Sequence, residues 1–421
     1  MNLYRKLFKM NKERKYLIFI FIIALILRLT YVLFFHQLKI ESDALQYDTI
    51  GWNLAFGDGF SLEPGVPTPV RAPVYPFFLS FIYLIFGHSY LVVRLAQAIL
   101  SALTCLVIYW LGKEIFDEEM GRVTSLIIAL YPVLISYTGF LLTETLFTFL
   151  LSITALFLVR AVKNRLGKYY AISGMLLGIT TLCRATTMLF PFFIFVGLWA
   201  VYKVKIRAIV HFLIFLSMMV VVIIPWTVRN YFRFHTFLPV ATGGGLTLWA
   251  GTYVPWDGKY QGVTTEPLRT MGEEYSPIEL DKRLFKEGVR NIKERPIKYF
   301  IMSIKKFPRF WITSHSSVFG IDKPNSWYLR ERQYFPLFVK FCLLLLHTVT
   351  LILGIIGVFL IRRQWKSCII PLLLICFFTG HIFLVTIPRY HVPVLPYVFI
   401  FASVCLIKIN KKIIESKVKL G

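Results

Sequence analysis

The sequence predicts an all-helical protein that crosses a membrane many times, and three observations lead to this fold class. Of the 421 residues, 57% are hydrophobic and only 16% are charged. The mean hydropathy of +0.66 is too high for a soluble domain of this size. Long apolar runs recur along the chain, separated by short segments rich in lysine and arginine. We therefore predict an all-α polytopic membrane protein.

The formal net charge of +25 would suggest nucleic-acid binding in a soluble chain. Here much of the lysine and arginine lies between apolar runs, which is the topology signal of a membrane protein. We expect no nucleic-acid partner. The six cysteines lie in or beside apolar runs without a paired ligand spacing, so the sequence indicates neither a metal cluster nor a disulfide scaffold.

The apolar runs predict about ten membrane spans, each long enough to cross about 30 Å of hydrocarbon. The first begins near Tyr16, lacks a small-residue cleavage site and is interpreted as a retained helix rather than a signal peptide. The predicted spans are 16–35, 89–111, 122–139, 141–160, 169–183, 186–202, 206–226, 336–360, 367–387 and 391–408.

Alternate connections between these spans are basic, which predicts that they face the cytoplasm. They are the N-terminal tail, residues 160–168, 203–207 and 362–366, and the tail from Lys408. Both termini are then cytoplasmic, in what we expect to be a prokaryotic plasma (inner) membrane. Residues 36–88 and 227–335 form the two large outer stretches.

The first outer stretch predicts a short helix after Asp43 that stops at the turn signal Gly57-Asp58-Gly59. A proline-rich passage follows. Residues 74–86 are apolar but too short to span comfortably, so they predict a re-entrant or interfacial helix. A rigid outer rim results.

The second outer stretch predicts two amphipathic helices. Ser276-Pro277-Ile278-Glu279 reads as a capping box that starts a helix running to about Arg295. Pro296 opens another helix in which apolar and basic residues alternate at helical spacing, which favours a membrane-surface position over packing on its own domain. We divide the chain into an N-terminal transmembrane module (1–226), an external region (227–335) and C-terminal spans with a basic tail (336–421).

Two acids fall on the predicted outer side, and they are our candidates for chemistry. Asp43 directly follows the first span, and Glu144 lies in the break between two later spans. Carboxylates near lipid are costly and are usually functional. The plainer alternatives are a helix N-cap for Asp43 and a helix-dipole contact for Glu144.

Several short motifs resemble GT-C glycosyltransferases, closest to the family 39-like group of protein O-mannosyltransferases and lipid A aminoarabinose transferases. The similarity covers nearly the whole chain. The motifs are Asp43 to Tyr47, Gly57 to Phe60, Arg71 to Pro76, Arg94 to Gln97, Tyr131-Pro132, Thr143 to Phe147, Gly174 to Gly178 with Arg184, Pro225 to Asn230, Gly243 to Gly251, and Arg389-Tyr390.

The resemblance implies a polyprenyl-phosphate-linked sugar as donor, an acceptor lipid, glycan or protein, and inverting transfer on the external face. It implies a GT-C-like bundle with external amphipathic helices, and it supports Asp43 as general base. Glu144 could hold a sugar hydroxyl, ligate a divalent cation or orient a basic side chain. No cofactor is certain, although Asp43 and Glu144 leave a divalent cation open. The expected substrate-binding residues are Tyr47, Arg71, Arg184, Arg229, Arg389 and Tyr390.

Arginine suits a lipid phosphate because its planar fork gives two directed hydrogen bonds. We favour Arg389 for this role, while snorkelling to the headgroup layer is the alternative for each arginine. Asp48 and Asp58 are weaker acid candidates, explained by a helix and a turn. Arg28, within the first span, is expected to snorkel outward or pair with an interior acid.

Two further patterns favour structural interpretations. Gly243-Gly244-Gly245 lacks the spacing of a phosphate loop and predicts a tight turn. His211, His347 and His381 lie in or at the ends of apolar runs at unrelated spacings, which is typical of packed or interfacial histidines rather than of a metal site. A secondary transporter or flippase of a lipid-linked glycan remains the alternative function, although no repeat of two similar halves is evident.

Overall fold

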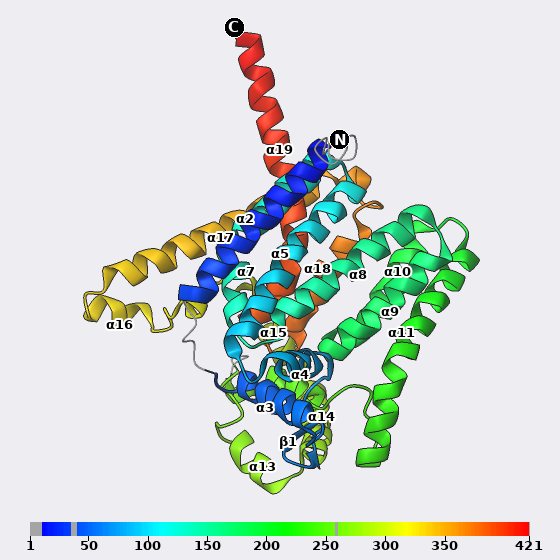
Figure 1. The fold of residues 1–421 in the computed structure, drawn as a ribbon, viewed down its shortest axis with the longest axis vertical. Coiled ribbons are helices and arrows are strands. Elements are labelled where there is room, and N and C mark those ends of the chain that lie inside the picture. Colours follow the sequence, from blue (N-terminus) through cyan, green and yellow to red (C-terminus); the bar gives the residue numbers. More distant parts are fainter. Residues whose placement is uncertain (1–10, 35–39, 257–259, 421) are drawn as a thin grey trace, which may run out of the picture.

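A computed structural model describes residues 11–34, 40–256 and 260–420, with the backbone alone considered from 412 onward. The described residues are mostly helical, as predicted. In Figure 1 the start of α2 (Lys12–Phe34) and the end of α19 (Leu395–Leu420) lie at one end of the molecule. The elements α3 (Asp43–Phe56), β1 (Ser61–Glu63), α4 (Val74–Phe86), α13 (Leu268–Glu274) and α14 (Pro277–Glu294) gather at the opposite end. The two predicted outer stretches therefore contribute to one common end of the molecule.

Within the described residues, six helical segments are long and apolar enough to cross a membrane. They are α2 (Lys12–Phe34), α5 (Tyr90–Ile115), α8 (Glu144–Asn164), α11 (Lys205–Phe234), α17 (Tyr334–Leu360) and Pro388–Lys411, which joins η7 (Pro388–Val394) to α19 (Leu395–Leu420).

The remaining predicted spans are shorter or bent in the structure. The run 122–139 forms α6 (Glu118–Leu130), α7 (Pro132–Ser136) and η1 (Tyr137–Gly139), bent by 59° at Tyr131, where Pro132 follows. Proline lacks the N–H that would continue the first helix, which accounts for the break. Three further predicted spans form shorter helical segments. They are α9 (Gly167–Cys183), the pair η2 (Ala185–Leu189) and α10 (Phe190–Val201), and the pair α18 (Ile369–Thr379) and η6 (Gly380–Phe383). The short η5 (Arg362–Gln364) precedes α18.

Glycines allow the spans to pack closely. A Cβ on Gly174 of α9 would lie 2.1 Å from the carbonyl oxygen of Phe215 in α11. A Cβ on Gly357 of α17 would lie 1.8 Å from the carbonyl oxygen of Phe401 in α19. Small residues at helix interfaces let backbones approach in this way, as is common in membrane bundles.

The first outer stretch forms the predicted short helix α3 (Asp43–Phe56), which ends at Gly57 in the left-handed conformation with φ of 100°. Helix α4 (Val74–Phe86) follows the proline-rich passage, as predicted. Between them β1 (Ser61–Glu63) and β2 (Val66–Pro67) pair as a small antiparallel hairpin that the sequence analysis did not predict. Gly65, at φ of 76°, supplies its turn.

The second outer stretch contains α12 (Gly244–Thr252), η3 (Val254–Trp256), α13 (Leu268–Glu274), α14 (Pro277–Glu294), α15 (Pro296–Trp311), η4 (Ser316–Phe319) and α16 (Asn325–Arg330). Both reciprocal bonds of the predicted capping box at Ser276 are present. The Gly243 to Gly245 segment is a helix start, because Asp281 accepts hydrogen bonds from the backbone N–H groups of Gly243, Gly245 and Leu246. The predicted tight turn is therefore wrong, because Gly244 and Gly245 are the first two residues of α12.

Arg28 corrects one expectation, since it neither snorkels nor pairs with an acid. The side chain is fully buried, and it donates to the Ser101 hydroxyl and to the backbone carbonyls of Ala24, Ala129 and Ile128. Neighbouring helix carbonyls therefore satisfy the guanidinium inside the bundle. Arg28 joins α2 to α5 and α6, which is a structural role.

Candidate active site

The carboxylate of Asp43 lies between two arginines. Asp43 is the first residue of α3, and one oxygen accepts from Arg71 Nη2 at 2.5 Å. The other oxygen accepts a hydrogen bond from Nη2 of Arg389, a residue of η7. No side chain caps the start of α3. The N-cap alternative therefore does not describe Asp43, whose charge is directed at the two arginines.

Glu144 is more deeply buried than Asp43, and its side chain also lies close to Arg389. It begins α8, its side chain is 2% exposed, and it accepts from Arg184 Nη1 at 3.3 Å. Its Oε1 atom lies 3.8 Å from Arg389 Nε. Arg389 thus connects two acids that are 101 residues apart in sequence and sit on different helices. The arrangement is a charged cluster of Asp43, Glu144, Arg71, Arg184 and Arg389.

Two tyrosines expected at the site flank this charged cluster. Arg71 lies over the ring of Tyr47, 4.9 Å from its centroid. Arg184 lies over the ring of Tyr390, 4.7 Å from its centroid. Cation–π contacts of this kind hold guanidinium planes in place without neutralising them. The arginines are therefore oriented but keep their positive charge.

Electrostatics keep Asp43 ionised. Burial alone would raise the pKa of this carboxyl, but Arg71 and Arg389 outweigh burial and lower the pKa to about 2. Arg71 has its own pKa raised in spite of its burial, because Tyr47 and Asp43 favour its charged form. With three guanidinium groups facing two carboxylates, the charged cluster is positive and suited to a further anion.

A buried hydrogen-bond network positions the backbone that leads into Glu144. Arg94 Nε donates to the carbonyl of Gly139 at 2.8 Å, and Gln97 Nε2 donates to the carbonyls of Thr138 and Phe140. The hydroxyl of Tyr75 donates to Gln97 Oε1 at 2.9 Å. The Arg94 to Gln97 motif therefore supports the segment just before Glu144, while Arg94 itself also lines a cavity beside Asp43.

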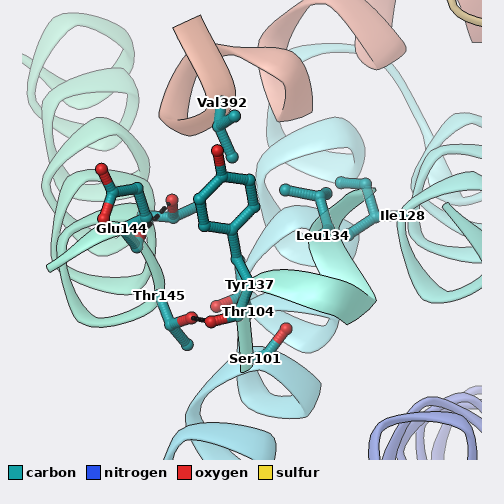
Figure 2. A pocket seen from close by; sticks show the side chains of 9 residues that line it. Ser101, Thr104, Ile128, Leu134, Tyr137, Glu144, Thr145 and Val392 are labelled. Carbon is teal, nitrogen blue, oxygen red and sulfur yellow. Dashed lines mark hydrogen bonds between the residues drawn. The ribbon is translucent and has the colours of Figure 1, made fainter. Parts of the chain in front are cut away.

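Two cavities adjoin the charged cluster. One of about 220 Å³ is lined by Asp43, Arg94, Arg389 and the segments 40–44 and 139–142. Figure 2 shows the other, where Glu144 from α8 and Val392 from η7 lie around the ring of Tyr137. At about 10 Å³ it has room for about one water molecule. Only the cavity beside Asp43 and Arg389 approaches the size of a substrate group.

Other sequence candidates lie elsewhere. Arg229 of α11 donates to Asn230 Oδ1 and the Phe60 carbonyl, and its guanidinium packs among the rings of Phe60, Trp226 and Phe234. Asp48 accepts from Tyr83 and Tyr90 and contacts His88. The backbone of Asp58 belongs to the turn after α3, where its N–H donates to the Asn53 carbonyl. These three residues therefore do not join the charged cluster.

Sequence reasoning missed two residues of the site. Gln46 Oε1 accepts from Arg71 Nε at 2.8 Å, so it shares Arg71 with Asp43. Tyr260 is near Asp43, Tyr390 and Arg389, and burial raises the pKa of its hydroxyl to about 12. Gln46 lies inside the Asp43 to Tyr47 motif, so its position in that motif was a usable signal. Nothing in the sequence around Tyr260 distinguishes it from other loop tyrosines.

A divalent cation does not fit between Asp43 and Glu144 in this arrangement. Each carboxylate already has two arginine partners, Arg71 and Arg389 for Asp43 and Arg184 and Arg389 for Glu144. A cation placed there would face three guanidinium groups at close range, which like-charge repulsion opposes. The two acids are therefore placed to hold the arginines rather than a cation.

Comparison with known proteins gives a family match over part of the chain. Residues 70–228 match the family model described as dolichyl-phosphate-mannose-protein mannosyltransferase. This region contains Arg71, Glu144 and Arg184, whereas Asp43 and Arg389 lie outside it. No curated protein matches the sequence significantly.

Solved structures match over nearly the whole chain. The oligosaccharyltransferase of Archaeoglobus fulgidus in its apo form has a TM-score of 0.58 at 14% identity, covering 98% of this chain and 52% of that one. The same enzyme, AglB, in complex with an inhibitory peptide and a dolichol-phosphate has a TM-score of 0.57 at 12% identity, covering 97% and 52%. This chain thus spans about half the length of that relative.

A weaker likeness, with a TM-score of 0.45 and 16% identity, covers 91% of this chain and 77% of ArnT from Cupriavidus metallidurans bound to undecaprenyl phosphate. The two AglB matches extend over the spans and both outer stretches. The chain is therefore an all-α integral membrane protein with the GT-C fold, and its residues 70–228 match the mannosyltransferase family model.

Proposed function

We propose that this protein is a glycosyltransferase that moves a sugar from a polyprenyl-phosphate donor to an acceptor hydroxyl. The observation that carries the proposal is the charged cluster, in which Arg389 joins Asp43 to Glu144 beside a cavity of about 220 Å³. The match to a mannosyltransferase family model supports it. So does the shared fold with an oligosaccharyltransferase whose structure was solved with a dolichol-phosphate.

The proposed reaction is a single displacement at the anomeric carbon. The acceptor oxygen forms a bond to that carbon while the bond from the carbon to the phosphate oxygen breaks. The electron pair leaves with the phosphate, the acceptor proton goes to Asp43, and the configuration at the carbon inverts. Because the acceptor attacks one face of the sugar and the phosphate leaves from the other, the base and the phosphate must lie on opposite sides of the sugar. The charged cluster would provide groups for both sides, since it extends from Asp43 to Arg184.

The arginines would stabilise the departing phosphate. Positive groups held in place where negative charge develops lower the barrier, because they need not reorganise during the reaction. Arg389 is the best candidate for contact with the phosphate, because its Nε atom is buried without a hydrogen-bond partner among the described residues. Arg184, held over Tyr390, would be the second phosphate contact.

A carboxylate with a pKa of about 2 is a weak base for a resting alcohol. It is adequate here because the acceptor proton becomes strongly acidic once the new carbon–oxygen bond is largely formed. A phosphate beside Arg389 would also draw positive charge away from Asp43 and raise its basicity. Glu144 would then keep Arg184 and Arg389 aligned.

Orientation and partners follow from the same proposal. The basic connections favour cytoplasmic termini and an external active site in a prokaryotic plasma membrane. The division at residues 226 and 335 would separate two transmembrane modules from an external region that borders the site. The donor tail would lie in the membrane, and the acceptor would be a lipid, a glycan or a protein.

Proteoliposomes containing the purified chain and a polyprenyl-phosphate sugar fraction test the proposal. A transferase releases free polyprenyl phosphate and glycosylates an added acceptor extract, both measured by mass spectrometry. A flippase or transporter moves the intact lipid between leaflets without releasing its sugar. Leaflet movement with no free polyprenyl phosphate would reject the transferase proposal.

A further inference from the structure

Three buried histidines from separate elements meet beside the charged cluster. His315 immediately precedes η4, His347 lies in α17 and His391 lies in η7, and they are 4%, 1% and 0% exposed. One ring nitrogen or another from each residue lies within 4.8 Å of the others. Sequence spacing did not reveal this group, because 32 and 44 residues separate its members.

Hydrogen bonds define which ring nitrogen of His347 carries the proton. Its Nε2 atom lies 2.7 Å from the carbonyl oxygen of Trp311, which can only accept, so Nε2 carries the proton. The Nδ1 atom then carries the lone pair, and it accepts a hydrogen bond from the Tyr131 hydroxyl at 2.7 Å, which a bound ion would replace. Metal-binding histidines usually donate the other ring N–H to a carbonyl or carboxylate in this way.

The other two rings are close together and incompletely satisfied. His315 Nε2 and His391 Nε2 are 3.0 Å apart. Two nitrogen ligands of one tetrahedral zinc ion are about 3.3 Å apart, given bonds of about 2.0 to 2.1 Å. The Nδ1 atom of His391 is buried without a hydrogen-bond partner among the described residues. Neutral imidazole is the form that binds metals.

We propose that His315, His347 and His391 form a site for one divalent transition-metal ion of the zinc class. Imidazole nitrogen is a preferred ligand of such ions, and three histidines leave a fourth position that the Tyr131 hydroxyl borders. Oxygen-seeking ions such as magnesium find no carboxylate among the three ligands.

The site would fix the segment that carries Arg389. His391 is two residues beyond Arg389 in η7, while His315 and His347 belong to the outer stretch and α17. A bound ion would therefore join three segments that are distant in sequence and hold Arg389 near both acids. The role is structural, and the site stands whether or not the chain is a glycosyltransferase.

Metal content tests the site directly. The full chain is purified in detergent without chelators or an affinity metal, and its metals are measured by mass spectrometry. We expect about one zinc per chain in the parent, and a loss of at least about five-fold in His315→Gln, His347→Gln and His391→Gln, since each removes one of three ligands. His211→Gln, a control with a partly buried ring that pairs with Tyr202, keeps the metal.

A second measurement needs no variant and remains valid if the substitutions prevent folding. X-ray absorption of the zinc-loaded parent should show imidazole scattering at about 2.0 to 2.1 Å. A first shell of oxygen alone would overturn the proposal. In the metal-content measurement, metal that is lost in the Asp43→Asn, Glu144→Gln double variant but kept in the histidine variants would overturn it too. A parent that binds no zinc or cobalt after dialysis would overturn it as well.

Discussion

Arg389 donates a hydrogen bond to Asp43 across 346 residues of sequence, so η7 near the C-terminal end of the chain reaches back to the start of α3. The same side chain lies 3.8 Å from Glu144. Opposite charges brought together from three parts of the chain constrain the fold, and removing one leaves the others buried and unbalanced. This sharing makes Arg389 the residue on which the proposed site depends most.

Replacing Arg389 should weaken the binding of lipid phosphate. A charged hydrogen bond contributes about 1.5 to 3 kcal/mol, so Arg389→Ala should raise the Kd for undecaprenyl phosphate by about 10- to 100-fold. Binding is measured in nanodiscs. Arg229→Ala, which removes a rim arginine away from the charged cluster, serves as control and should keep the parent's Kd. Unchanged affinity in the Arg389 variant would remove the phosphate role.

Glu144 and Arg184 should be coupled in stability. Their side chains are 2% and 15% exposed, so breaking the pair leaves a buried charge at a cost of about 3 to 5 kcal/mol. A double-mutant cycle with Glu144→Gln and Arg184→Ala, followed by reversible unfolding in detergent, should give coupling above about 1 kcal/mol. The exposed Glu266–Arg269 pair is the control and should give less. Equal coupling in both pairs would contradict the electrostatic account.

The stabilisation provided by Asp43 should persist well into the acid range. Its pKa is lowered to about 2 in the folded chain, against about 3.9 when unfolded. The contribution is therefore fully present above about pH 4 and is lost as the pH falls toward 2. The difference in melting temperature between the parent and Asp43→Asn should be constant from about pH 7 to 5 and shrink below about pH 4. A difference that disappears near neutral pH would contradict this pKa.

Close packing of α17 on α19 should depend on Gly357. An added Cβ would meet the Phe401 carbonyl at 1.8 Å, so Gly357→Ala should force the helices apart and cost about 1 to 3 kcal/mol. Gly272→Ala in α13 is the matched control, because no atom lies within 4 Å of its added Cβ. Thermal unfolding in detergent measures both variants. Similar melting temperatures for the two would show that the helices accommodate the methyl group.

Local patterns predicted most of the helices. Glycine at position 57 ended α3, the capping box started α14, and apolar length located the long spans. The hairpin near Gly65 was missed because its strands are only two or three residues long, too short for an alternating pattern. The buried position of the Arg28 side chain was not predicted, because its partners are carbonyls of other helices, which no local pattern encodes.

The candidate site could be predicted only in part. The motifs pointed to Asp43, Glu144, Arg71, Arg184 and Arg389, and the structure brings these five residues together. Arg229 matched a motif equally well, yet α11 directs it toward Phe60 and Trp226. Which arginines meet the acids depends on helix rotation and packing. The same holds for the three histidines, which become neighbours only when η7 packs against α15 and η4 packs against α17.

Steady-state kinetics of Asp43→Asn in proteoliposomes, together with its affinity for the lipid-linked donor, test the central claim most directly. The amide keeps the shape of the carboxylate but cannot take the acceptor proton. We predict that kcat falls by about 10²- to 10⁴-fold while the donor Kd stays within about three-fold of the parent. Turnover at the parent's rate in this variant would contradict the proposed reaction centre.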